Sequence, residues 1–233
     1  MIVAAAVCPS PPLLARELTG RAEVLPELTG ACAAAAGHLL ATAPDVIAVV
    51  GAGQETATWD PDDRLDLSAY APLPAAGRPV TRQPGKPGLP LALGIGALLL
   101  DEAGYAGPRI LQAVDESASA AACLRLGRDL ATAAPRAALL AVGDGSARRG
   151  PDAPGYVDER AVPFDDAVRD AMREGDMAAL AGLEADLARD LMATGRAAWQ
   201  VLAGAYEGAG RPAAAIRYAA DPFGVAYLVA LLT

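Results

Sequence analysis

Hydrophobic runs alternate along this chain with longer segments in which apolar and polar residues mix at helical spacing. Three uninterrupted apolar runs, Ile2–Val7, Val46–Val50 and Ala137–Val142, have the length of strands, and each is followed within two residues by proline or glycine. Runs that are apolar on both faces are typical of strands in a parallel sheet that is covered on both sides. We therefore expect these three runs to form the centre of a sheet.

The segments between these runs predict helices and further strands in alternation. Helices are expected over 25–43, 91–103, 119–132 (or from 117), 163–174, 177–194 and 197–206, and additional strands over 109–114, 213–218 and 225–232. Residues 54–90, rich in Pro, Gly and Asp, predict a long loop. Repeated strand–helix–strand order predicts an α/β protein, a three-layer α/β/α sandwich with a mostly parallel central sheet. A length of 233 residues suits one domain spanning 1–233.

Composition narrows the classes of partner and compartment. The formal net charge is −9, with 28 acidic residues against 19 basic ones, so a nucleic acid or an anionic membrane surface would be repelled and is not an expected partner. The sequence contains no stretch of 18 uncharged apolar residues, so it predicts no membrane span. Three scattered cysteines without a CxxC pair favour a reducing compartment, and a cytoplasmic location is expected.

Candidate chemistry lies in the loops that follow the predicted strands, because ligands of parallel sheets bind at the carboxyl ends of the strands. These loops are 8–12, 51–56, 115–119, 143–149 and 219–223. The alternative for each is a simple turn. Thr56 replaces the third glycine of a dinucleotide-binding fingerprint, and Asp144 stands where a nucleophile elbow before Ser146 requires glycine, so both motifs are excluded.

The single histidine limits metal and nucleophile chemistry further. His38 lies inside an Ala- and Leu-rich predicted helix, and one histidine cannot form an iron site of two histidines and one carboxylate. We expect it to serve packing or capping. Cys8 has no evident basic neighbour that would lower the pKa of its thiol, so a buried thiol at a strand end is the expected role.

Taken in chain order, these loops resemble the class III extradiol ring-cleavage dioxygenases of the catalytic β-subunit type. Residues 9–14 (PSPPLL) resemble the family's PHPPLL opening, and 143–148 (GDGSAR) are similar to its GDLSHR. Residues 44–53 resemble its second strand, 164–176 match its Phe-Asp…Gly-Asp helix, and 222–230 (PFGVAYLVA) resemble its closing Pro-Tyr/Phe-Gly-Val-Gly-Tyr motif. The similarity spans nearly the whole chain and implies that family's fold.

The departures from the family motifs fall on the residues that carry its chemistry. The resemblance places the two iron-ligand histidines at Ser10 and Gly53 and the catalytic histidine at Ala147. The acidic ligand falls on Ala219 or Ala220, with Asp221 displaced beside it. Serine, glycine and alanine supply neither the imidazole and carboxylate ligands nor the proton shuttle that ring cleavage requires. The resemblance therefore implies the fold without the dioxygenase activity, and neither a metal nor another cofactor is expected.

The aligned cleft keeps side chains that suit hydrogen bonding to a small polar molecule. Its candidate ligand-binding residues are Ser10, Gly53, Gln54, Asp144, Ser146, Ala147, Arg148 and Asp221. Arg148 is the group suited to a carboxylate or phosphate. The alternative is that Asp144 caps a turn and Arg148 is solvated.

Three functional hypotheses follow. The first is a non-catalytic homologue that binds a small polar ligand or a protein partner. The second is an enzyme of metal-independent chemistry, a hydrolase or lyase that uses Ser10, Asp144 or Ser146. The third is a subunit whose partner chain completes the site, and a homodimer is also compatible with the resemblance.

Overall fold

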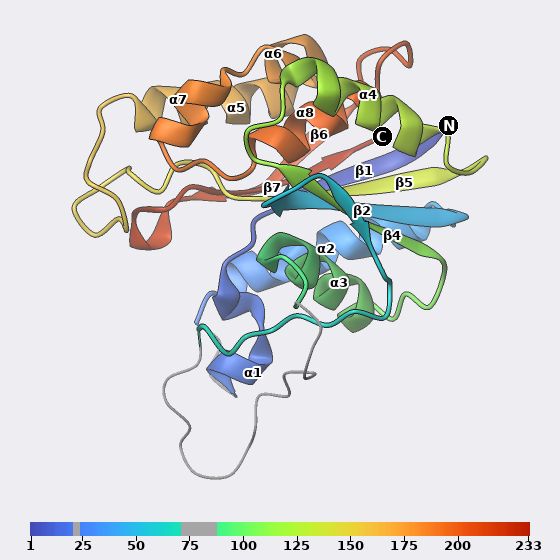
Figure 1. The fold of residues 1–233 in the computed structure, drawn as a ribbon, viewed down its shortest axis with the longest axis horizontal. Coiled ribbons are helices and arrows are strands. Elements are labelled where there is room, and N and C mark those ends of the chain that lie inside the picture. The colour runs from blue at the N-terminus through green and yellow to red at the C-terminus, as the bar shows by residue number, and fades with distance from the viewer. Residues whose placement is uncertain (21–23, 71–87) are drawn as a thin grey trace.

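The protein is built around a seven-stranded sheet in the order β3-β4-β2-β5-β1-β7-β6 (Figure 1). The computed structural model describes residues 1–20, 24–70 and 88–233. The strands are β1 (Ile2–Cys8), β2 (Val46–Gly53), β3 (Ala57–Trp59), β4 (Arg109–Asp115), β5 (Ala137–Val142), β6 (Ala214–Ala220) and β7 (Tyr227–Leu232). The helices are α1 (Arg16–Thr19), α2 (Pro26–Ala41), α3 (Leu91–Glu102), α4 (Ala120–Ala131), α5 (Ala161–Glu174), α6 (Met177–Ala181), α7 (Ala185–Asp190) and α8 (Arg196–Ala205).

The sheet is mixed, which corrects the expectation of a mostly parallel sheet. Strands β4, β2, β5 and β1 are parallel neighbours, whereas β3, β7 and β6 each join the sheet by antiparallel pairing. The β6–β7 connection is a short 3₁₀ turn at Pro222–Gly224, and so short a link can only join antiparallel strands. Strand β3 lies within the predicted loop 54–90, of which 71–87 falls outside the described residues.

Helices cover both faces of the sheet, as the alternation of strands and helices predicts. Figure 1 shows α2 and α3 on one face and the group from α4 to α8 on the other. Along β1, the side chains of Ala5 and Val7 join the core under α4–α8, and those of Ala4, Ala6 and Cys8 join the core under α2 and α3. Each central strand is therefore apolar on both sides, which is why it reads as an uninterrupted hydrophobic run.

The structure confirms the predicted start of one helix and contradicts the predicted extent of another. Ser119 caps α4 by accepting a hydrogen bond from the Ala122 amide at 3.3 Å, as expected of one of two candidate serines. The single helix expected over 177–194 is wrong, because the chain breaks near Gly182 into α6 and α7. The buried Gln200 amide donates to the carbonyl oxygens of Ala181 and Leu183, which supplies the hydrogen bonds that the break leaves open.

The direction of the strands gathers the candidate loops at one edge of the sheet. Strands β1, β2, β4 and β5 end there, and so does β6, because it is antiparallel to β7, which is antiparallel to β1. Ser10, Gly53, Asp144 and Asp221 all lie at or just beyond these strand ends. We call this the carboxyl edge. Within the described ranges, no helix combines the length and apolarity needed to cross a membrane.

Candidate functional site

Ser10 and Asp144 meet at the carboxyl edge, as the resemblance implies. Strands β1 and β5 are parallel neighbours with Cys8 opposite Val142, so the residues that leave each strand emerge side by side. The Ser10 amide donates to Asp144 Oδ1 at 2.7 Å, and the Ser10 hydroxyl lies 3.3 Å from Asp144 Oδ2. Asp144 is itself anchored, because its amide donates to Thr194 Oγ1 at 3.1 Å. Both oxygens of the carboxyl group therefore face Ser10.

The Asp144 carboxyl is set apart from other acids by its surroundings. Burial raises its pKa to about 6, and the hydrogen bonds from Ser10 only partly oppose that shift. None of the ion pairs between described residues involves Asp144. Tyr227 lies close enough that, after burial, the charge of Asp144 is the next cause of a raised pKa for its phenol. The group is thus a carboxyl that changes protonation near neutral pH.

This pKa shift predicts a pH-dependent contribution to stability. Below about pH 4, Asp144 is protonated in both the folded and unfolded states. Between the ordinary pKa of an aspartate and the raised pKa of about 6, the folded state binds more protons than the unfolded state. The free energy of unfolding therefore falls as the pH rises through this range. Urea unfolding should show the wild type losing roughly 2 kcal/mol relative to Asp144→Asn between about pH 4 and about pH 7. A pH-independent difference between the two proteins would contradict the assigned shift.

Ser146 is enclosed within the loop that follows β5. Its side chain is fully buried, its hydroxyl donates to the Leu191 carbonyl at 2.9 Å, and it accepts from the Arg148 amide at 3.1 Å. Its own amide donates to Asp165 Oδ1 at 2.9 Å. Ser146 therefore fixes the shape of residues 143–149 and is not accessible to a ligand or a substrate.

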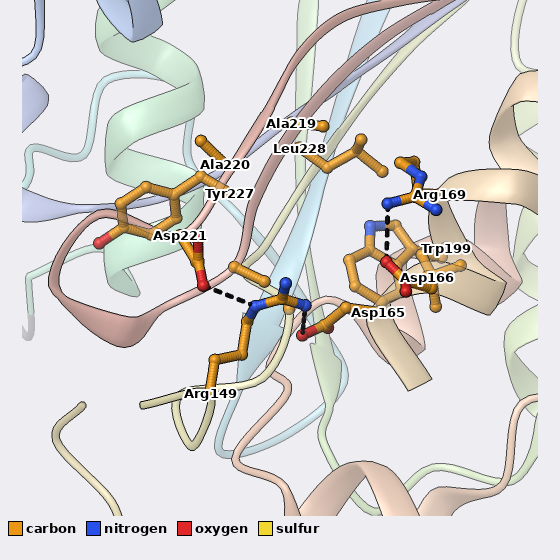
Figure 2. A pocket seen from close by; sticks show the side chains of 13 residues that line it. Arg149, Asp165, Asp166, Arg169, Trp199, Ala219, Ala220, Asp221, Tyr227 and Leu228 are labelled. Atoms are coloured by element: carbon orange, nitrogen blue, oxygen red, sulfur yellow. Dashed lines mark hydrogen bonds and ion pairs between the residues drawn. The ribbon is translucent and has the colours of Figure 1, made fainter. Parts of the chain in front are cut away.

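Asp221 pairs with Arg149, the neighbour of the candidate ligand-binding residue Arg148. Arg149 Nε donates to Asp221 Oδ2 at 3.0 Å and Arg149 Nη1 donates to Asp165 Oδ2 at 3.1 Å (Figure 2). Arg148 instead has a buried Nε without a hydrogen-bond partner among the described residues. Neighbouring residues in an extended loop point in different directions, and the sequence pair Arg-Arg does not reveal which one reaches the edge.

The remaining predicted residues contribute shape rather than functional groups. A Cβ at Gly53 would lie 2.9 Å from the Ala113 Cβ, so the glycine permits close pairing of β2 and β4. Gln54 is exposed just beyond β2. Ala147 is buried, and its amide donates to the Leu191 carbonyl at 3.1 Å. None of these three residues contacts the Ser10–Asp144 pair by a hydrogen bond in the described structure.

A hollow of about 110 Å³ lies between α5, α8 and the β6–β7 hairpin. Arg149, Asp165 and Asp221 lie along one side of it, and Figure 2 shows the Arg149 guanidinium between the two carboxylates. A second pair on α5, Arg169 Nη1 and Asp166 Oδ1, is 2.6 Å apart. Tyr227 lines the hollow and also lies near Asp144. The side chain of Tyr227 belongs to the core under α2 and α3, whereas those of Trp199 and Leu228 belong to the core under α4–α8.

Within the hollow, the pKa of the Asp165 carboxyl is raised by burial, although its hydrogen bonds from the Ser146 amide and Arg149 lower it. Sequence reasoning missed Asp165 and Trp199 as site residues. Asp165 lay in the Phe-Asp pair that the family resemblance had already marked, which was the one available signal. Nothing in the sequence distinguishes Trp199 from an ordinary core residue of α8.

The donor set at the carboxyl edge does not fit the iron that the resemblance implies. In the described ranges, no group of three or more His, Cys, Asp or Glu side chains has an arrangement that could hold a metal ion. His38 Nε2 lies 3.2 Å from the carbonyl oxygen of Leu232, the last residue of β7, at the opposite edge of the sheet. His38 therefore contacts the end of β7 and lies away from the carboxyl edge.

Cys8 is fully buried at the end of β1, as expected. A hydrogen bond with Cys32 and burial raise the pKa of its thiol, which is opposite to the shift a nucleophilic thiolate needs.

Comparisons with known proteins bear on the fold only. No model of a protein family matches this sequence, and no curated protein matches it. Solved structures similar to this chain include the crystal structure of an uncharacterized protein from Escherichia coli K12, which is 14% identical over 99% of both chains with a TM-score of 0.54. At this level of identity the similarity shows a shared α/β fold and nothing about activity. The resemblance to extradiol dioxygenases therefore rests on the sequence motifs.

Proposed function

We propose that this protein is a non-catalytic homologue of the class III extradiol dioxygenases that binds a small polar ligand at the carboxyl edge. The observation that carries the proposal is the chemistry left at the positions of the family's two iron-ligand histidines and its catalytic histidine. Of Ser10, Gly53 and Ala147, only Ser10 has a polar side chain, and its hydroxyl faces the Asp144 carboxyl at 3.3 Å. Such a set offers Fe(II) no imidazole and leaves no proton shuttle.

The ligand-binding half of the proposal is supported by what the edge retains. A polar hollow lies between α5, α8 and the β6–β7 hairpin, and its Arg149 is hydrogen-bonded by two carboxylates. Small-molecule sites are concave and have a few fixed polar groups that orient the ligand. A polar hollow of this kind is what the proposed binding of a small polar ligand requires.

The test of the catalytic half uses protein produced without a histidine tag. Purified protein should hold much less than one iron per chain, should not bind Fe(II) stoichiometrically under anaerobic conditions, and should not cleave catechol after iron is added. Metal analysis and the absorbance of the ring-cleavage product provide the measurements. Stoichiometric iron together with turnover would overturn the proposal.

The ligand-binding half is tested by thermal unfolding against a panel of small polar metabolites. A ligand that binds the folded state alone raises the unfolding temperature, and the rise grows with the ratio of the ligand concentration to its Kd. At least one compound should stabilise the wild type and lose its effect when Arg149 is replaced by methionine. A panel without any stabilising compound would contradict ligand binding.

A second candidate function, metal-independent acid–base catalysis by Asp144 with Ser10, is favoured by one observation. A carboxyl with a pKa of about 6 is suited to proton transfer near neutral pH. This candidate requires a turnover that Ser10→Ala or Asp144→Asn abolishes while the unfolding temperature is maintained. Ser146 has no part in it, because its hydroxyl is enclosed.

A further inference from the structure

Large apolar side chains are exposed together at one end of the protein. Nine such side chains are exposed in the described structure, and five of them belong to the segments that follow β5, α7 and β6. The other four are spread between residues 1 and 70, and single exposed apolar residues of that kind are ordinary. We call the five residues the apolar patch: Tyr156 (90% exposed), Val157, Val162, Met192 and Phe223.

Contacts between the three segments bring the apolar patch to the same end of the molecule. A Cβ at Gly155 would lie 2.9 Å from the sulfur of Met192, and a Cβ at Gly224 would lie 2.6 Å from the Cβ of Ala153. The loop after β5 therefore contacts both the end of α7 and the β6–β7 turn. Figure 1 shows this loop (yellow), α7 and the turn (red) at one end of the sheet.

The backbone that carries the patch is ordered by hydrogen bonds. The Gly155 amide donates to the Ala147 carbonyl at 3.0 Å, and the Arg149 amide donates to the Gly224 carbonyl at 3.2 Å. Phe223 has a φ of 61°, a left-handed conformation that is unfavourable for a bulky residue. A costly conformation that leaves an aromatic ring exposed points to a role outside the fold. Side chains on an ordered backbone also lose less entropy when a partner covers them.

The surroundings of the patch are acidic. The segments 148–162, 184–192 and 221–223 together carry seven carboxylate side chains against four arginines. Asp152 and Glu159 are exposed, and neither forms an ion pair with a described residue. An apolar centre with an acidic rim is complementary to a surface that is apolar at its centre and basic around it.

This charge distribution distinguishes between the classes of partner. Arg160 is already paired with Asp158 at 2.7 Å and with Asp190 at 3.5 Å. A second copy of the chain would bring the same acidic rim and a net charge of −9, so its approach is opposed by repulsion. An anionic membrane surface would be repelled in the same way. The remaining class is a protein with a basic, apolar segment.

We propose that the apolar patch is a docking surface for a protein partner that presents apolar side chains flanked by lysine or arginine. This inference goes beyond the proposed function, because none of the five residues of the patch lines the hollow. Tyr156 is the expected anchor of the contact. It is the most exposed of the five, and tyrosines that become buried contribute strongly to protein interfaces.

Fluorescence anisotropy of the full chain with a labelled lysine–leucine peptide tests the proposal. Leucine at every third or fourth position gives this peptide an apolar face when it is helical, and lysine occupies the other positions. It should bind about tenfold more tightly than a scrambled peptide of the same composition. The same pattern with glutamate in place of lysine should not bind. Asp152→Asn combined with Glu159→Gln should weaken binding about threefold, because it removes unpaired charge from the rim.

Variants of the patch locate the binding. Tyr156→Ser combined with Val157→Ser should weaken binding of the lysine–leucine peptide about tenfold. Phe223→Asn removes a ring without adding backbone strain, since asparagine tolerates the left-handed conformation, and should weaken it about threefold. Tyr70→Ser is the matched control and should leave binding unchanged. Tyr70 is also exposed, but it follows Leu67, which belongs to the core under α2 and α3. Thermal unfolding checks that each variant is folded.

The remaining outcomes would overturn the proposal in different ways. Equal binding of the designed and scrambled peptides would show that charge alone attracts them. Equal losses in the Tyr156 and Tyr70 variants would place binding outside the patch. Sedimentation velocity of the protein alone gives the third outcome. A wild-type dimer that Tyr156→Ser dissociates would assign the patch to a second copy of this chain instead of a basic partner.

Discussion

Replacing Gly127 with alanine is expected to lower the free energy of unfolding by about 3 kcal/mol. Gly127 of α4 lies against α8, where a Cβ would be 2.1 Å from the carbonyl oxygen of Val201 and 2.6 Å from the amide nitrogen of Ala205. Gly204 of α8 is equally close to Leu124 of α4. Because the obstructing atoms belong to the backbone, the two helices must separate to admit one methyl group. That separation disturbs the core beneath them.

Gly37→Ala in α2 is the matched control for this substitution. Gly37 is also a helical glycine, but it is exposed and nothing lies within 4 Å of a Cβ built there. Alanine should therefore stabilise the protein by about 0.5–1 kcal/mol through its higher helix propensity. Urea unfolding of both variants gives the comparison. Equal effects of the two substitutions would show that α4 and α8 do not approach each other as closely as the structure has them.

Replacing Asp165 with alanine is expected to have the second large effect, again about 3 kcal/mol of lost stability. Asp165 is 9% exposed and accepts from both Arg149 Nη1 and the Ser146 amide. Its removal leaves a largely buried guanidinium with one partner and a buried N–H with none. The loop over 143–149 would lose the contact that connects it to α5.

The comparison with Asp221→Ala isolates the role of burial in this effect. Asp221 accepts from the same guanidinium at a similar distance but is 49% exposed. Exposed ion pairs contribute little, so Asp221→Ala should cost less than about 1 kcal/mol. Chemical unfolding of the two variants measures both. Similar losses would mean that Arg149 does not depend on Asp165 more than on Asp221, and the role of Asp165 in ordering the hollow would have to be abandoned.

If Asp165→Ala and Asp221→Ala have the expected effects, the hollow is a preorganised site. The loop after β5 is fixed by Ser146 and Asp165, and Arg149 leaves that loop in a single orientation. A ligand that meets ordered donors loses less conformational entropy on binding than one that must order them. Such rigidity is what the proposed ligand binding at the carboxyl edge requires.

Much of the framework could be predicted from the sequence because its signals are local. Three central strands read as uninterrupted apolar runs, since each is covered on both faces, and Ser119 marks the start of α4. The family resemblance also implied that Ser10 and Asp144 share a cleft. They meet because β1 and β5 are parallel neighbours, which the structure shows.

Only the tertiary structure decided which side chains form the hollow and which merely support it. Arg149 rather than Arg148 pairs with Asp221, which is 72 positions away in the chain. The Ser146 hydroxyl donates its hydrogen bond to the carbonyl oxygen of Leu191, 45 positions away. The unpaired indole of Trp199 and the hydrogen bonds that Gln200 of α8 donates at the break between α6 and α7 likewise arise only when distant segments pack. Hydrogen-bond partners, burial and the resulting pKa shifts are properties of long-range packing, and the local pattern of residues does not contain them.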